Sequence, residues 1–430
     1  MKKIISKSLF KQALIVFSGR VGAAGFGYII ILIVARILGP EQFGLYSFFV
    51  VLTILGSSLI GEAFAHAIVR NHVLYTKDKS KNASTVLVNA LTIRVFAGMP
   101  VIIAGILFGN MIALTIFSDP QYAIPITLGC IGSFAMALWT FSLTTLQATE
   151  SFTAHALLTP LVNLLRIMSI PILLSMGLFT LEAIIGVYVG SYLLCAVIAI
   201  WFLRHRLHGG KASLFEIKSQ LSFSKWMALA IICQLLQTHL AIPILGYYST
   251  KFAVGIFSAA ATLLIVVDHI TTAILTVQYP KVAKLDDLNS QISFVKQTLL
   301  FSLLIVLFLS PGLFIIEPII HLLYGQEYVG STPVFQILFI GLLSALISQP
   351  LNLLFLARNK SHYWSTMAIF SLLIWFIVGY FLIPKHGAVG AAWTTTIARF
   401  SNTVMTFTLL FRTLYVEKRK ERNLIQPKVN

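Results

Sequence analysis

Long apolar runs alternate with short polar connections along the whole 430-residue chain. Each run has about 20 residues, the length an α-helix needs to cross the hydrocarbon core of a bilayer. The runs lack the two-residue alternation typical of strands in a membrane β-barrel. We therefore predict an all-α polytopic membrane protein. Its twelve expected transmembrane helices span residues 13–37, 43–68, 84–108, 122–147, 156–176, 182–203, 226–247, 252–279, 296–317, 332–356, 364–383 and 388–411.

The limits of the first and third spans follow from the lengths of their apolar runs. The first apolar run continues past Arg20 to Ile37, which is longer than the apolar region of a signal peptide, so we expect an uncleaved first span. The third run has Phe117 as an alternative end. At the first outer corner, Gly39 suits the position just after a helix, and Pro40 and Glu41 suit the first turn of the next helix.

Composition and charge agree with membrane insertion. The chain is 58% hydrophobic and 10% charged, with a mean hydropathy of +0.90, whereas soluble domains are about 25% charged. Most of the 31 Lys and Arg residues fall in the connections expected inside, and the outer connections hold only Arg36, Lys251 and Lys385. By the positive-inside rule, both termini are expected in the cytoplasm. The net charge of +17 predicts attraction to anionic membrane lipids and no binding of nucleic acid.

The chain lacks the motifs of several enzyme classes. There is no GxxxxGK[ST] loop for a nucleotide and no HExxH or CxxC motif for a metal. Cys130, Cys195 and Cys233 lie within apolar runs and are expected to be buried. We expect a transporter without catalytic residues, metal or cofactor, and not an enzyme.

A weak internal repeat divides the chain near its midpoint. "FGLYS" at 43–47 aligns with "VGIFS" at 254–258, and "IFSDPQYAIP" at 116–125 aligns with "LYGQEYVGSTP" at 323–333. Transporters are often built from two such repeats, related here by a pseudo-two-fold axis along the membrane normal. The expected parts are an N-terminal six-helix lobe (1–205), a cytoplasmic linker (206–225), a C-terminal six-helix lobe (226–411) and a basic cytoplasmic tail (412–430).

Four arginines lie within the predicted spans: Arg20, Arg94, Arg166 and Arg399. An ionisable side chain inside a membrane is costly, and it usually faces the interior of a helix bundle or a wet cavity. Because guanidinium suits phosphate and carboxylate groups, these arginines predict a cationic cavity for an anionic substrate. The alternative is that each arginine reaches the interface or pairs with a carboxylate.

Four further candidate residues are ionisable and fall within the second and eighth predicted spans. Glu62 lies near His66, and Asp268 adjoins His269. Such groups can carry protons or bind a coupling cation in transporters, so these four are candidates for coupling to a H⁺ or Na⁺ gradient. The alternative is that each pair is a local structural contact.

Four segments together resemble a known family: "ARILGPEQFGLYSFFVVLT", "LQATESF", "LLYGQEYVGSTPVFQIL" and "PKHGAVGAAWTTTIA". They are similar to the polysaccharide-transporter branch of the multidrug/oligosaccharidyl-lipid/polysaccharide exporter superfamily, and in particular to the O-antigen or capsular repeat-unit flippases called Wzx. The resemblance covers essentially the whole chain. The first-hairpin segment is its most specific part.

This resemblance implies two six-helix lobes that open alternately to each side of the bacterial inner membrane. It implies a substrate of undecaprenyl-diphosphate-linked oligosaccharide, moved from the inner to the outer leaflet for the synthesis of O-antigen and lipopolysaccharide, capsule or exopolysaccharide. A polysaccharide polymerase and a chain-length regulator are implied as partners. The family has no fixed motif that maps onto Arg94 or Arg166, so their assignment rests on their depth in the spans.

Three other functions remain open from the sequence. The first is a multidrug exporter of the same fold, although its cationic drugs would prefer an acidic cavity. The second is a membrane glycosyltransferase or polysaccharide polymerase, although such an enzyme is expected to have larger outer loops than this chain. The third is a purely structural scaffold.

Overall fold

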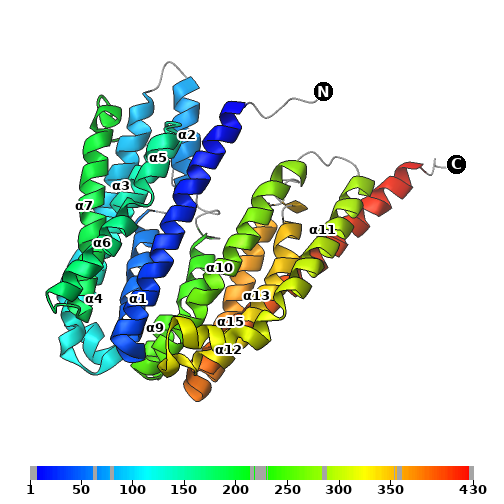
Figure 1. The fold of residues 1–430 in the computed structure, drawn as a ribbon. Coiled ribbons are helices and arrows are strands. Elements are labelled where there is room, and N and C mark those ends of the chain that lie inside the picture. Colours follow the sequence, from blue (N-terminus) through cyan, green and yellow to red (C-terminus); the bar gives the residue numbers. More distant parts are fainter. Residues whose placement is uncertain are drawn as a thin grey trace. The chain divides into compact units, whose positions relative to one another are not determined.

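The structure is a computed structural model that describes residues 7–61, 65–77, 82–213, 217, 229, 231–282, 288–352, 354–355 and 361–425. Within these residues the chain is built from α-helices, short 3-10 helices and turns, without a β-strand. It divides into two compact units, Met1–Ile232 (unit 1) and Cys233–Asn430 (unit 2). Figure 1 shows that each unit is a bundle of helices.

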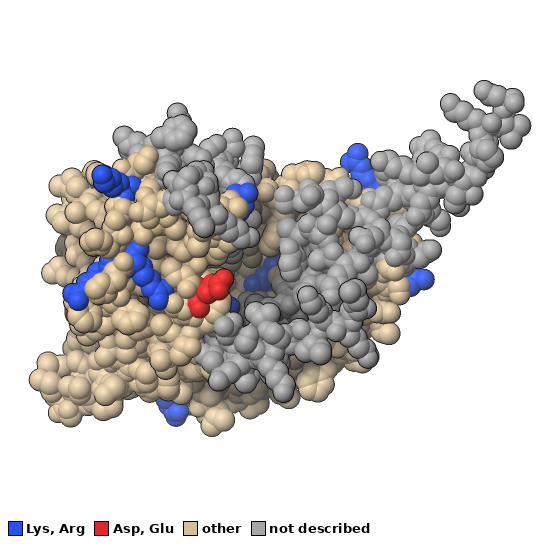
Figure 2. All heavy atoms as spheres, turned by 90° about the horizontal axis from the view of Figure 1, so that it is seen from above, with Lys and Arg blue, Asp and Glu red and all other residues tan. Residues whose placement is uncertain are grey.

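Helices suited to a membrane dominate both units. The described residues contain nine helices that are long and apolar enough to cross a bilayer, and two shorter apolar helices, Lys251–Ile265 and Gly312–Leu323. Where Figure 2 shows described residues, Lys and Arg side chains are scattered among mostly uncharged ones. The prediction of an all-α membrane protein is confirmed.

Two of the nine helical stretches are too long for a single crossing. Ser18–Ile60 has 43 residues and His362–Tyr415 has 54, whereas a 30 Å core needs about 20. Each is interrupted by one glycine with non-helical dihedral angles, Gly39 (φ 73°, ψ 171°) and Gly387 (φ 53°, ψ −128°). A positive φ costs glycine little because it has no Cβ. The turn predicted at Gly39 is confirmed, and each stretch contains two segments of spanning length.

Unit 1 has one helix at its centre. Its elements are α1 (Lys7–Ile60), α2 (Ala65–Lys77), α3 (Ala83–Phe117), η2 (Pro120–Tyr122), α4 (Ala123–Ala148), α5 (Phe152–Leu158), α6 (Leu161–Ser175) and α7 (Leu181–Leu207). Helix α4 packs against α1, α3 and α7, and it is the most buried of the spans in this unit.

Small residues let α4 approach its neighbours closely. A Cβ atom on Gly56 of α1 would lie only 2.3 Å from Ser133 Oγ of α4. The Ser133 hydroxyl instead donates to the carbonyl of Gly129, 2.9 Å away in its own helix. Apolar burial drives no association between helices in lipid, so such close contacts and hydrogen bonds hold the bundle together.

Unit 2 repeats this plan with its own elements. A helical stretch Ile231–Tyr248 ends in α9 (Ala241–Tyr248). It is followed by α10 (Lys251–Val282), α11 (Leu288–Leu309), α12 (Gly312–Leu323), η3 (Gln326–Tyr328), α13 (Ser331–Ser348), η4 (Gln349–Asn352) and α15 (Ser361–Ile425). Helix α13 is the most buried span and packs against α10, α11, α12 and α15.

The aligned repeat segments have the same local structure in the two units. In unit 1, Ser118 has a left-handed conformation (φ 53°), and the 3-10 helix η2 then leads into α4. In unit 2, Gly325 has a positive φ of 104°, and η3 leads into α13. In each unit, a residue with positive φ and a 3-10 helix therefore lead directly into the central helix. The sequence repeat corresponds to a structural one at this point.

Several predicted span limits differ from the observed helices. Helix α3 ends at Phe117, which is the alternative end for the third span. The predicted span 43–68 is interrupted because α1 ends at Ile60 and α2 begins at Ala65. The predicted spans 156–176 and 296–317 are interrupted at Pro160 and Pro311, where the missing N–H of proline ends one helix and starts the next.

The residues that follow α7 are bound to unit 1. Asn82 donates from Nδ2 to the carbonyl of Gly209 at 2.8 Å, and the Ser213 N–H donates to Asn89 Oδ1 at 2.8 Å. Arg206 donates to the hydroxyls of Thr149 and Ser151 in the turn between α4 and α5. The first residues of the predicted linker 206–225 are therefore part of unit 1, and 214–216 and 218–225 lie outside the described residues.

The imidazole of His72 on α2 lies beside this turn. Burial lowers its pKa below the usual 6.5, and the charge of Arg206 acts in the same direction, against a backbone hydrogen bond at Ala148 that raises the pKa. As the pH falls below 6.5, the unfolded chain therefore binds a proton before the folded chain does, and stability decreases. We expect His72→Gln to show a smaller loss of melting temperature than the wild type between pH 7.5 and 5.5. Identical pH profiles of the two purified proteins would contradict this assignment.

Candidate functional site

Arg166 is the centre of the most developed polar cluster that the structure describes within a span. It lies on α6, and its side chain is only 8% exposed. Its Nε donates to Ser191 Oγ at 2.9 Å, and its Nη2 donates to the carbonyl of Tyr188 at 3.2 Å. Nη1 donates to Asn163 Oδ1, one turn earlier on α6, at 3.4 Å. Helix α7 therefore supplies two of the three acceptors.

Two tyrosine rings enclose the same guanidinium. Its central carbon lies 3.7 Å from the ring centre of Tyr188 and 4.5 Å from that of Tyr192. A cation over an aromatic face is stabilised by the ring quadrupole, and the effect grows when water is excluded. Tyr46 of α1 contacts the Tyr188 ring edge-on, with ring centres 6.2 Å apart. We call Arg166, Asn163, Tyr188, Ser191, Tyr192 and Tyr46 the Arg166 cluster.

The cluster also connects both segments of α1. Asn163 donates from Nδ2 to the carbonyl of Ala23 at 2.8 Å, and a Cβ atom on Gly27 would lie 3.1 Å from the same nitrogen. A small pocket beside Arg166 is lined by Ile30 and Val34 of the first segment of α1 and by Tyr46 of the second. The pocket has space for about one water molecule. In this conformation it is therefore too small for a larger ligand.

The charge of Arg166 has no acidic partner among the described side chains. Its hydrogen-bond acceptors are a hydroxyl, an amide oxygen and a backbone carbonyl, all of them neutral. These groups accept hydrogen bonds from the guanidinium, but among the described residues of unit 1 none of them carries a negative charge that would compensate it. A buried site of this kind favours an anion and disfavours a cation.

Arg94 on α3 has a different environment. It is 1% exposed and donates from Nη2 to the carbonyl of Gly61 at 3.1 Å and from Nη1 to the carbonyl of Ala90 at 3.2 Å. A Cβ atom on Gly61 would lie 2.8 Å from Arg94 Cγ. Arg94 thus binds the carbonyl end of α1, where a cation is favoured by the helix dipole.

The other two predicted arginines lie elsewhere. Arg20 is on the exposed side of α1, next to Gly19, which packs against the Ala156 backbone of α5. Arg399 is partly buried on α15 in unit 2. The structure therefore places three of the four arginines in unit 1 and brings neither Arg20 nor Arg94 into the Arg166 cluster. Their role in binding a substrate stays a prediction.

The candidate residues for ion coupling lie outside the described side chains. Glu62 is outside the described residues altogether. His66 on α2, and Asp268 and His269 on α10, belong to described helices, but their side chains are not among those described. Their coupling role stays a prediction too.

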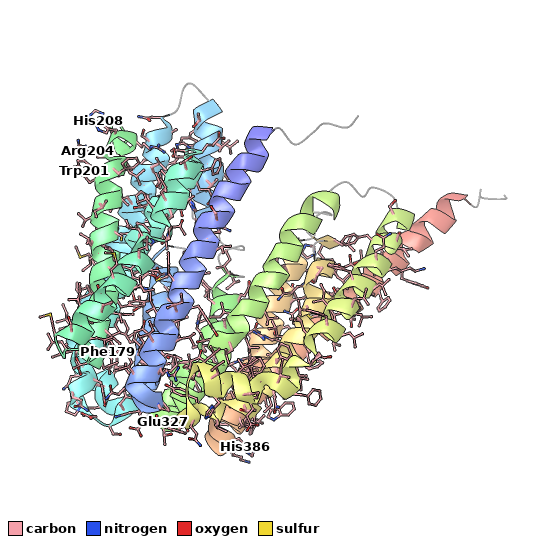
Figure 3. All side chains as sticks on the ribbon, viewed as in Figure 1. Phe179, Trp201, Arg204, His208, Glu327 and His386 are labelled. Carbon is pink, nitrogen blue, oxygen red and sulfur yellow. The ribbon has the colours of Figure 1, made fainter. Side chains whose placement is uncertain are left out.

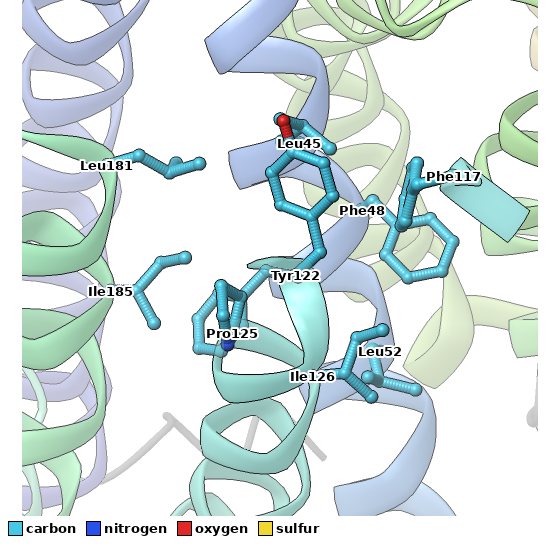
Figure 4. Close-up of a pocket in the computed structure, with 10 residues that line it drawn as sticks. Leu45, Phe48, Leu52, Phe117, Tyr122, Pro125, Ile126, Leu181 and Ile185 are labelled. Carbon is cyan, nitrogen blue, oxygen red and sulfur yellow. The ribbon is translucent and has the colours of Figure 1, made fainter. Parts of the chain in front are cut away.

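A second pocket in unit 1 is apolar. Figure 4 shows Phe48 and Leu52 of α1 facing Ile126 of α4, with Phe117 and Tyr122 beside them. Its space also suffices for no more than about one water molecule. It lacks charged groups in its lining and serves as packing between α1, α4 and α7.

The sequence identified Arg166 but not the residues that surround it. Tyr188, Ser191 and Tyr192 lie in "VYVGSYLL", where two aromatic rings and a hydroxyl share a transmembrane helix. Spacing of three and four residues puts them on one face of α7. This pattern is a signal that could have indicated the partner helix of Arg166.

Comparisons with known proteins place these observations in a family. Residues 33–333 match the family model described as "Polysaccharide biosynthesis protein". A capsular polysaccharide biosynthesis protein, CapF of Staphylococcus aureus, is 32% identical over 154 residues, which are 35% of this chain and 39% of that protein. The chain thus matches about two fifths of the length of its curated relatives.

Two solved structures share the fold. The lipid II flippase MurJ in an inward closed conformation matches with a TM-score of 0.73 and 15% identity, over 94% of this chain and 87% of MurJ. An inward-facing multidrug resistance MATE family transporter of the MOP superfamily matches with a TM-score of 0.70 and 14% identity, over 92% of this chain and 95% of the transporter. Because the family match covers more than half of the residues, this chain belongs to the polysaccharide biosynthesis protein family and has the transporter fold shared by MurJ and MATE proteins.

Proposed function

We propose that this protein moves undecaprenyl-diphosphate-linked oligosaccharide repeat units from the inner to the outer leaflet of the bacterial inner membrane. The observation that carries the proposal is the buried positive charge of Arg166 without a described acidic partner, in a chain of a polysaccharide biosynthesis family. A diphosphate is an anion that such a charge suits. The relative CapF is a capsular polysaccharide biosynthesis protein, and MurJ is a lipid II flippase.

The proposed topology has twelve spans in two six-helix lobes, with both termini in the cytoplasm. It counts two spans in each of α1 and α15 because each has an interrupting glycine. The proposed lobes are residues 1–205 and 226–411, with a linker at 206–225 and a cytoplasmic tail at 412–430. The lobes would rock around the diphosphate while the lipid tail stays in the bilayer.

Further parts of the proposal concern substrate contacts and partners. Arg20, Arg94 and Arg399 would join Arg166 in binding the diphosphate or an anionic sugar. Glu62, His66, Asp268 and His269 would couple transport to a H⁺ or Na⁺ gradient. A polysaccharide polymerase and a chain-length regulator would use the product in the synthesis of capsule, exopolysaccharide or O-antigen of lipopolysaccharide.

A multidrug exporter is the second candidate because the fold also matches a MATE transporter. The Arg166 cluster argues against it, since a cationic drug would be repelled by a buried guanidinium that has no acidic partner among the described side chains. The two functions differ in a simple observation. Overproduction of this protein should leave drug resistance unchanged, whereas an exporter of cationic drugs would raise it.

The direct test uses cells that lack this protein. We expect them to lose surface polysaccharide and to accumulate the lipid-linked repeat unit on the cytoplasmic leaflet, and the wild-type chain should restore export. The lipid-linked intermediates are extracted and quantified, and surface polysaccharide is measured by immunoblotting. Normal export in cells without the protein would refute the proposal. Polymerisation of lipid-linked repeats by the purified protein would instead favour a polymerase.

A further inference from the structure

Helix α7 has two different faces toward its C-terminal end. One face is buried: Cys195, Ala196 and Ala199 pack in a cluster with Trp139 and Val162 of the neighbouring helices. The opposite face is exposed along residues that are three or four positions apart. We call this face the α7 stripe; it consists of Leu194, Val197, Ile198, Trp201, Arg204 and His208.

The α7 stripe changes from apolar to basic along its length. Val197 and Trp201 are 65% and 62% exposed, as expected for side chains that face lipid. Arg204 and His208 follow on the same face and are exposed. Figure 3 shows Trp201, Arg204 and His208 together at this end of α7, pointing away from the bundle of unit 1. Tryptophan is typical of the interface between the bilayer and water.

Arg204 is held in place but keeps donors available. Its guanidinium carbon lies 4.8 Å from the ring centre of Trp201, and its Nε donates to His205 Nε2 at 3.5 Å. Among the described residues, neither of its terminal nitrogens donates a hydrogen bond to the protein. A guanidinium with both terminal nitrogens available can bind two oxygens of one phosphate.

Arg206, only two positions further, serves a different purpose. It lies toward the buried side and donates to Thr149 and Ser151 in the turn between α4 and α5. Near the C-terminal end of α7, Arg206 therefore makes contacts within the protein, whereas Arg204 is directed outward. Lys211 adds a second exposed cation just after the helix.

We propose that the α7 stripe is a binding site for an anionic phospholipid. The phosphate would lie at Arg204, with His208 and Lys211 beside it, and an acyl chain would lie along Trp201 and Val197. The order of these groups along the helix matches the order of acyl chain, interface and phosphate in a phospholipid. The site is independent of the proposed substrate and of the Arg166 cluster.

The test measures lipid retained by the purified full-length chain. The protein is exposed to equal amounts of phosphatidylglycerol and phosphatidylcholine in mild detergent, and bound lipid is counted by native mass spectrometry. We expect the wild type to retain phosphatidylglycerol preferentially and Arg204→Gln to retain roughly five-fold less, the contribution of one basic residue near an anionic lipid surface. Trp201→Leu, which keeps an apolar side chain but removes the ring, should give a smaller loss.

Arg412→Gln is the matched control because it removes an exposed arginine from α15, at the start of the C-terminal tail that is expected on the same membrane face. It should retain phosphatidylglycerol as the wild type does. Equal losses in Arg204→Gln and Arg412→Gln, or no loss in Arg204→Gln, would overturn the site. Thermal stabilisation by inorganic phosphate without lipid, lost in Arg204→Gln, would overturn the lipid assignment in favour of a soluble anion.

Discussion

Arg166→Gln is expected to reduce the export of surface polysaccharide at least about ten-fold while the protein still reaches the membrane. The substitution keeps a polar, though shorter, side chain and removes the positive charge enclosed by Tyr188 and Tyr192. A hydrogen bond to a charged group contributes about 1.5–3 kcal/mol, and 1.4 kcal/mol corresponds to a factor of ten in binding or rate. Surface polysaccharide per cell and protein in the membrane fraction are measured together.

Two further variants separate charge from structure. Arg166→Lys keeps the charge but loses the planar fork, so export should lie between that of the wild type and that of Arg166→Gln. Ser191→Ala removes the acceptor of Arg166 Nε but keeps the guanidinium, and it should retain most of the export. If Arg166→Gln exports normally, or if Ser191→Ala is as defective as Arg166→Gln, the cluster has a structural role and not a substrate role.

Gly390→Ala is expected to destabilise unit 2 by at least about 2 kcal/mol. A Cβ atom at this position would lie 2.1 Å from the carbonyl oxygen of Leu382, across the turn at Gly387 that joins the two segments of α15. The neighbour is backbone, so a side-chain rotation cannot relieve the contact. We expect a melting temperature several degrees lower and less protein in the membrane, measured by thermal unfolding in detergent and by immunoblotting.

Gly186→Ala in α7 is the matched control for this prediction. The space around Gly186 is open, with no heavy atom within 4 Å of the added Cβ. Alanine is a better helix former than glycine by about 1 kcal/mol, so this variant should be as stable as the wild type or slightly more stable. If Gly390→Ala melts at the same temperature as the wild type, the close approach of the two α15 segments is not required for the fold.

The apolar pattern predicted most elements because membrane insertion depends on local composition. The all-α membrane class, the turn at Gly39 and the paired segments 116–125 and 323–333 all follow from runs, breaks and short motifs that one reads along the chain. The limits of spans failed where proline interrupts an apolar run, as at Pro160 and Pro311. Hydropathy does not register these interruptions because the residues on both sides remain apolar.

The arginines show where such prediction ends. Their depth in apolar runs identified all four as unusual, but depth is the same for an arginine that binds a carbonyl and for one that is enclosed by aromatic rings. Arg94 contacts Gly61, 33 positions away in the chain, whereas Arg166 contacts Ser191, 25 positions away. Neither partner could be identified from spacing along a single helix.

By itself, the sequence determined that this protein is a helical membrane protein and which family its motifs resemble. The face of the membrane on which each connection lies stays a prediction. Membrane insertion depends on the free energy of transferring each segment from water to lipid, and this free energy is a sum over the residues of that segment. It can therefore be read from the sequence. Only the tertiary structure decided that Arg166 is enclosed by side chains of α7, whereas Arg94 donates to the backbone carbonyls of Gly61 and Ala90. It also decided that Arg204 is exposed while Arg206 is bound to the turn after α4. Those outcomes depend on which helix faces pack together, because the cost of a charge in a membrane is set by the groups that surround it.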